Sequence, residues 1–181
     1  MLVHDWLSIG HAIETRKQQN KELSKLAELV GDIKFAMLTT MEKDGSLRSR
    51  PLATLQMDEE GQLWFFTSVS SPKADEVEHH HNVNVSYAHP EKQDYISVSG
   101  VAQILRDKDK MKELWTPWIK PWFPGGLDDP DLVLLKVTIQ EAEYWDAPGS
   151  AVKRAYGFAK AILTGNTDAL GDNKKIKALG E

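Results

Sequence analysis

The chain has 181 residues, a formal net charge of −5 and no cysteine. This length suits a sizeable hydrophobic core, so residues 1–181 are expected to fold as a single domain. The negative charge argues against nucleic acid as the main partner, and the lack of cysteine excludes disulfides and thiolate catalysis. No stretch approaches the roughly 20 apolar residues that span a bilayer, and the first residues lack the basic segment of a signal peptide. We therefore expect a cytoplasmic protein without a membrane partner.

The first two thirds of the chain predict one helix followed by a series of strands. Leucines at helical spacing predict a helix over about residues 7–30, which ends at Gly31. Asp44-Gly45 then predicts a hairpin turn, and Pro51 places the second strand at a sheet edge or a bulge, because proline cannot donate to a ladder. The strands expected in the barrel region, about 33–145, are residues 33–40, 46–57, 62–67, 83–87, 95–105 and 132–145.

Helices are expected between and after these strands. A short helix is predicted over 72–80, a second over 107–118, and a final helix over 151–163. The polar tail after Thr164 is expected to be loosely held, so that residues 151–181 form a helix and a tail. Strands that follow one another through hairpins, with helices inserted, predict a mainly β protein: a small antiparallel barrel with flanking helices.

A run of hydroxyl residues leads from the third strand into the short helix. Ser71 before Pro72 is typical of a helix N-cap followed by proline at the first helical position. The same helix N-terminus, with the hydroxyls of Ser68 and Ser70 and the ammonium of Lys73, could instead hold an anion. Capping alone and a phosphate site are both compatible with this stretch.

Two arginines on the second strand bear on that choice. Arg48 and Arg50 are two residues apart, so they share one face of a strand and repel each other unless an anion or a carboxylate lies between them. Surface ion pairs would satisfy them. Alternatively, they meet Lys73 and the loop over residues 67–73 at one dianionic phosphate, where each charge-assisted hydrogen bond contributes on the order of 1.5–3 kcal/mol.

Three motifs in this order resemble a known family. R-S-R-P at residues 48–51, W-F-F-T-S at 64–68 and S-P-K at 71–73 are similar to the FMN-binding split barrels of the pyridoxamine 5′-phosphate oxidase superfamily, in particular the bacterial general stress protein branch. Further matches lie at 82–87, 95–100 and 143–146, so that the resemblance covers residues 33–145. It implies a six-stranded antiparallel split β-barrel of Greek-key type, with FMN as the cofactor.

The resemblance also implies a role for individual residues. The FMN phosphate would be bound by Arg50, Lys73 and Ser71. The edge of the isoalloxazine ring would be lined by Arg48, Ser49 and Pro51, and the ring would lie along Phe66, Thr67 and Ser68. Trp145 would approach the flavin from the second subunit of a homodimer that holds FMN at its interface. The aromatic loop 115–123 would then serve as a lid or a dimer contact.

The expected function is that of an FMN-dependent oxidoreductase with hydride exchange at flavin N5, with NAD(P)H or another small molecule as electron donor. A protein that binds, senses or stores FMN without turnover is the alternative, and a deazaflavin-using relative is a third. No catalytic acid or base stands out in the sequence. The longer arginine-and-histidine substrate motif of the true oxidases is missing, since only Arg154 follows the sixth strand, and vitamin B6 oxidation is therefore unsupported.

Metal sites are not expected. The run 79–81 contains adjacent histidines, which point in different directions on a helix end, whereas ligands on one helical face are three or four residues apart. The acidic stretch 128–131 lacks the glycine and the terminal glutamate of a calcium loop. The basic residues at 174–177 are interpreted as a solvated end.

Overall fold

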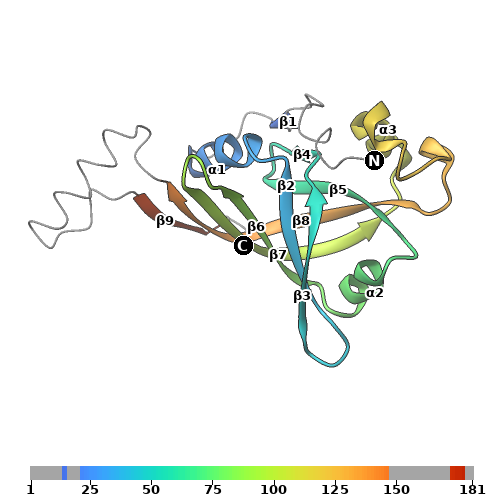
Figure 1. The fold of residues 1–181 in the computed structure, drawn as a ribbon, viewed down its shortest axis with the longest axis horizontal. Coiled ribbons are helices and arrows are strands. Elements are labelled where there is room, and N and C mark those ends of the chain that lie inside the picture. The colour runs from blue at the N-terminus through green and yellow to red at the C-terminus, as the bar shows by residue number, and fades with distance from the viewer. Residues whose placement is uncertain (1–13, 16–20, 147–171, 178–181) are drawn as a thin grey trace, which may run out of the picture.

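The computed structural model describes residues 14–15, 21–146 and 172–177. Within these ranges nine strands form one sheet in the order β1-β4-β5-β8-β7-β6-β2-β3, with β9 beside β8. Figure 1 shows a twisted and curved sheet. Helix α1 lies beside β1 and β4, and α2 and α3 lie toward the other end of the long strands. The strands are β1 (Glu14–Thr15), β2 (Phe35–Met41), β3 (Leu47–Ala53), β4 (Gln56–Met57), β5 (Gln62–Ser68), β6 (Asn82–His89), β7 (Asp94–Leu105), β8 (Leu132–Asp146) and β9 (Asp172–Lys177). The helices are α1 (Lys21–Gly31), α2 (Pro72–His79) and α3 (Lys108–Leu114), with 3₁₀ turns η2 (Pro117–Ile119) and η3 (Gly126–Asp128).

The sheet is rolled into a barrel by a connection between its two sides. β3 pairs with β2 at one edge of the sheet, whereas β4 pairs with β5 toward the other. Only residues 54–55 join them. The Thr54 N–H donates to the Lys34 carbonyl at 3.1 Å, and the Leu55 N–H donates to the Trp64 carbonyl at 2.9 Å. The mainly antiparallel split barrel with flanking helices predicted from the sequence is therefore confirmed.

The number and order of the strands differ from the prediction. The single strand expected over 46–57 is divided into β3, which pairs with β2, and β4, which pairs with β5. Its expected hairpin with the next strand is therefore limited to β4, whose two residues pair with β5. Pro51 lies on β3, which is an edge strand, as the missing N–H of proline predicted.

Both ends of the described chain also correct the prediction. Residues 14–15 form β1, parallel to β4, where a helix over 7–30 was expected, and α1 begins only at Lys21. Residues 172–177 form β9, where a loose tail was expected, because β8 continues beyond its pairing with β5 and offers a free edge at Glu141–Asp146. Ile176 is fully buried there. The predicted helix over 151–163 lies outside the described residues.

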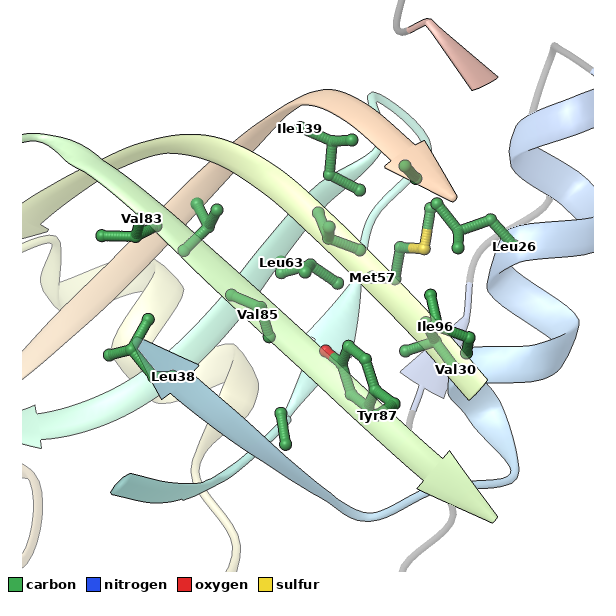
Figure 2. Packing of buried hydrophobic residues seen from close by; sticks show 14 of the residues in the cluster. Leu26, Val30, Leu38, Met57, Leu63, Val83, Val85, Tyr87, Ile96 and Ile139 are labelled. Carbon is green, nitrogen blue, oxygen red and sulfur yellow. The ribbon is translucent and has the colours of Figure 1, made fainter. Parts of the chain in front are cut away.

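The main core fills the barrel interior, as Figure 2 shows. Alternate residues of each strand point inward, and Phe65 is the largest of the fully buried side chains. Leu26 and Val30 on α1 contribute to the same core. None of the described helices is long and apolar enough to cross a membrane.

A second hydrophobic cluster covers the outer side of β5 and β8. Trp64 and Phe66 alternate with the inward residues of β5, so this strand is buried on both faces. The cluster consists of Trp64, Phe66, Met111, Leu114, Ile119, Phe123, Leu132 and Leu134. It fixes α3 and the following aromatic segment against the strand that carries Thr67 and Ser68.

Candidate functional site

A cavity of about 560 Å³ lies between β3, β5, the start of α2 and the aromatic segment 118–123. This volume is within the range of small-molecule sites in proteins. Its lining comes from segments far apart in the sequence, and β3 contributes the four consecutive residues 50–53. The lining residues are Phe35, Arg50, Pro51, Leu52, Ala53, Leu55, Phe66, Thr67, Ser68, Lys73, Trp118, Ile119, Trp122, Phe123 and Asp131.

Most of the cavity is apolar and aromatic. The aromatic wall, as we call it, consists of Phe35, Phe66, Trp118, Trp122 and Phe123. Trp118 and Trp122 meet edge to face with ring centroids 5.6 Å apart. Phe35 and Trp122 remain 45% and 47% exposed, which is unusual for such large apolar groups. A wall of this kind suits a flat aromatic ligand.

Arg50 brings a buried, incompletely bonded guanidinium to this cavity. Its side chain is only 16% exposed, and Nη1 lies 2.8 Å from Glu76 Oε2. The same Nη1 donates to Thr40 Oγ1 at 2.6 Å. Nη2 is buried and has no partner among the described residues. Because a buried donor without a partner costs about 1–3 kcal/mol, Nη2 is suited to a ligand acceptor.

Lys73 adds a second cation. It is half-buried, and the described residues include no hydrogen-bond or ion-pair partner for it. Burial, and then the positive charge of Arg50, lower the pKa of Lys73, while Glu76 and Asp131 oppose this change. Both cations line the same cavity. We refer to Arg50 and Lys73 as the cationic end of the cavity, which could hold a dianionic group such as a phosphate.

The serines before α2 are used by the protein itself. Ser71 occupies the N-cap position, but its Oγ donates to the Ser68 carbonyl at 2.6 Å and makes no cap hydrogen bond. The Ser68 hydroxyl donates to Asp131, and the Ser70 N–H donates to Asp131 Oδ1 at 2.9 Å. Hydrogen bonds from Ser68, and then from the Ser70 backbone, hold the pKa of Asp131 below its usual value. The predicted N-cap position of Ser71 is therefore confirmed, but its hydroxyl does not cap the helix, and the bonds to Asp131 fix the loop.

The structure divides the residues predicted for the site into two groups. Those that line the cavity are Arg50, Pro51, Phe66, Thr67, Ser68 and Lys73. Arg48 is exposed and lies 3.5 Å from Glu42, as expected for a surface ion pair. Ser49 bonds to Thr39 at 2.7 Å on the exposed face of β3.

Ser71 and Trp145 are also absent from the cavity lining. Trp145 lies near the end of β8, paired with Tyr95, and is exposed. Its expected role belongs to a second subunit and stays a prediction.

Sequence reasoning missed two kinds of site residue. Glu76 was not among the predicted site residues, although an acid beside Ala74 and Val77, both buried, signals an inward-facing carboxylate. Asp131 and Phe35 carry no local signal, because tertiary packing alone brings them to the cavity. Among residues 14–15, 21–146 and 172–177, no group of three or more potential metal ligands gathers at one point.

Comparisons with known proteins show the family of the chain. Residues 21–169 match the family model described as pyridoxamine 5′-phosphate oxidase like. Protein bli-3 of Neurospora crassa is 27% identical over 174 residues, which cover 91% of this chain and 83% of that protein.

Two solved structures share the fold. The general stress FMN/FAD binding protein of Xanthomonas citri is 26% identical, with a TM-score of 0.62 over 72% of this chain and 93% of that one. A protein related to general stress protein 26 from Clostridium acetobutylicum, of the pyridoxinephosphate oxidase family, is 21% identical, with a TM-score of 0.65 over 87% and 94%. At 21% identity, the similarity to the Clostridium acetobutylicum protein concerns the fold alone.

Proposed function

Because the chain belongs to the pyridoxamine 5′-phosphate oxidase-like family, we propose that it is a flavoprotein that binds FMN in the cavity beside β3 and β5. The observation that carries the proposal is the unpartnered Arg50 Nη2 next to Lys73, at one end of a cavity with an aromatic wall, within the part of the chain that the structure describes. The relative from Xanthomonas citri, named as an FMN/FAD binding protein, supports a flavin as the ligand.

The chain's residues fit the two parts of FMN. Arg50 and Lys73 would hold the phosphate through charge-assisted hydrogen bonds. The aromatic wall would bind the ring and exclude water from it, and Thr67 and Pro51 on the two flanking strands would orient its polar edge. Bound FMN would supply two-electron redox chemistry, which no side chain of this cavity can provide.

Purified protein tests FMN binding directly. We expect a yellow preparation with flavin absorbance, or an apoprotein whose melting temperature rises when FMN is added, because a ligand that binds only the native state stabilises it. A deazaflavin would appear instead by mass spectrometry of the released ligand. A colourless protein whose melting temperature does not respond to FMN would contradict the proposal.

The proposed activity is that of an oxidoreductase with NADH or NADPH as electron donor. The charged residues that line the described cavity are Arg50, Lys73 and Asp131, so the aromatic wall presents no acid or base beside a bound ring. This favours, as a second candidate, a protein that binds or stores FMN without turnover. Stopped-flow mixing with each donor separates the two, because the storage protein would show no flavin reduction beyond that of free FMN.

The exposed side of β2 and β3 supports a homodimer. Phe35, Met37 and Leu47 are large, apolar and exposed on this side, and Pro51 lies opposite Met37. Since Phe35 and Pro51 also line the cavity, a second copy that covers this surface would place FMN at the interface. Sedimentation equilibrium of the FMN-loaded protein should give twice the chain mass, and a monomer at micromolar concentration would argue against it.

A further inference from the structure

Glu76 is a buried acid that is bonded to the cationic end. Its Oε2 lies 2.8 Å from Arg50 Nη1 and accepts a hydrogen bond from Thr40 Oγ1 at 2.5 Å. The Arg50 Nη1 group also donates to Thr40, so three side chains from β2, β3 and α2 form a closed triangle. One half of the guanidinium is thus already bonded within the protein, and the other half is left for a ligand.

The charge of Glu76 persists at neutral pH. Burial alone would raise the pKa of Glu76, but the hydrogen bonds from Thr40 and Arg50 and the Arg50 charge outweigh it and hold the pKa below its usual value. The charged groups around the ligand position are therefore Arg50 and Lys73 as cations and Glu76 as an anion. Asp131 is a further anion, held by Ser68 and Ser70.

We propose that Glu76 is the built-in counter-ion of the cationic end and sets how strongly the cavity holds a phosphate. The inference rests on the proposed function, since it concerns the phosphate of FMN. Glu76 compensates Arg50 when the cavity is empty, and it repels a phosphate bound at Arg50 Nη2 and Lys73. It thereby limits the affinity for FMN and keeps the cofactor exchangeable.

The substitution Glu76→Gln tests this role. The amide has nearly the same shape, and its oxygen can still accept from Thr40 and Arg50, so that the main change is the loss of one negative charge. Removal of a charge so close to the phosphate should raise FMN affinity about tenfold. Riboflavin, which has the ring but no phosphate, should bind as it does to the wild type, so the FMN-to-riboflavin affinity ratio should rise about tenfold.

Asp75→Asn provides the matched control. Asp75 precedes Glu76 on α2, is exposed and lies 3.0 Å from Lys43, so this variant has the same formal charge change away from the cavity. Its affinity ratio should equal that of the wild type. A Glu76→Gln ratio that is unchanged or lower, measured by calorimetry with both ligands, would overturn the inference. If the role of Glu76 is purely structural, Glu76→Gln should lower the affinity for both ligands equally and leave the FMN-to-riboflavin affinity ratio unchanged.

Inorganic phosphate separates this inference from the proposed function. Without an added anion, the Glu76→Gln variant should have a lower melting temperature than the wild type, because Arg50 loses its counter-ion. Added phosphate should then raise its melting temperature more than that of the wild type or Asp75→Asn. If the wild type binds neither flavin, the proposed function fails, and an equal phosphate response in all three proteins would refute the role of Glu76. Sucrose in every buffer keeps a weakly folded variant measurable.

Discussion

Arg50→Ala and Lys73→Ala should each bind FMN roughly 10- to 100-fold more weakly than the wild type, because each loses a charge-assisted hydrogen bond to the phosphate. Riboflavin affinity should change little in Lys73→Ala, since Lys73 has no partner among the described residues whose loss would disturb the fold. Arg50→Ala should also be less stable, because it leaves the buried carboxylate of Glu76 without its cation. Calorimetric titration with FMN and with riboflavin measures both effects.

Arg48→Ala is the control for this prediction. Arg48 is on the same strand, two residues from Arg50, but it is exposed and lies 3.5 Å from Glu42. Its loss should leave FMN affinity within a factor of about two, as expected for a surface ion pair worth well under about 1 kcal/mol. If Arg48→Ala lowers FMN affinity as much as Lys73→Ala does, the phosphate lies elsewhere. The same holds if neither Arg50→Ala nor Lys73→Ala changes FMN affinity.

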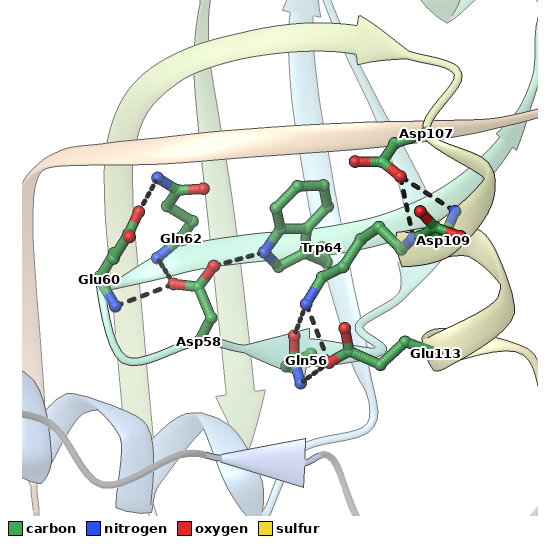
Figure 3. Close-up of polar contacts among 9 residues, drawn as sticks. Gln56, Asp58, Glu60, Gln62, Trp64, Asp107, Asp109 and Glu113 are labelled. Carbon is green, nitrogen blue, oxygen red and sulfur yellow. Dashed lines mark hydrogen bonds and ion pairs between the residues drawn. The ribbon is translucent and has the colours of Figure 1, made fainter.

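Asp58→Ala should lower the free energy of unfolding by about 3 kcal/mol, a large stability effect for one exchange outside the hydrophobic core. Asp58 is buried and accepts from Trp64 Nε1 at 2.7 Å and from the backbone N–H of Gln62 at 2.8 Å, as Figure 3 shows. A third donor, the N–H of Glu60, lies at 3.1 Å. The substitution leaves all three donors without this carboxylate, including the buried indole. Urea denaturation measures the loss.

Glu60→Ala is the matched control, because it removes an exposed carboxylate from the same turn. This carboxylate accepts from Gln62 Nε2 at 2.9 Å on the protein surface, so the free energy of unfolding should change by less than about 0.5 kcal/mol. Equal stability of Asp58→Ala and Glu60→Ala would show that the bonds to Asp58 contribute nothing to the fold.

The interaction of Asp58 with Trp64 also bears on the cavity. Lys110 of α3 lies over the Trp64 ring at 5.0 Å and donates to Gln56 of β4 at 2.5 Å. These contacts hold α3 against the sheet beside Gln56 and Trp64 (Figure 3), and the chain leads from α3 directly into the aromatic segment. The turn at Asp58 therefore helps to position part of the aromatic wall.

Local patterns predicted the parts of the fold that depend on neighbouring residues in the sequence. The alternation of Val83, Val85 and Tyr87 indicated β6, because a half-buried strand requires this period. Ser71-Pro72 indicated the start of α2. The two-residue period of β3 placed Arg48 and Arg50 on one face of the strand without saying which of them reaches a ligand, and the helix start placed Lys73 near that strand. The cationic end of the cavity was thus predictable.

Other features depend on contacts between distant segments. The separation of β3 from β4 follows from how the sheet closes, and no residue near Thr54 signals it. The pairing of β9 requires the free edge of β8, far away in the sequence. The family resemblance assigned Arg48 and Ser49 to the flavin; in the described structure they pair with Glu42 and Thr39 and are not among the residues that line the cavity, and their role stays a prediction.

A crystal structure of the protein with bound FMN tests the central claim most directly. The account predicts the phosphate oxygens within hydrogen-bond distance of Arg50 Nη2 and Lys73 Nζ, and the ring against Phe66 and the tryptophans of the aromatic segment. A phosphate that contacts neither cation, or a ring bound outside this cavity, would contradict it.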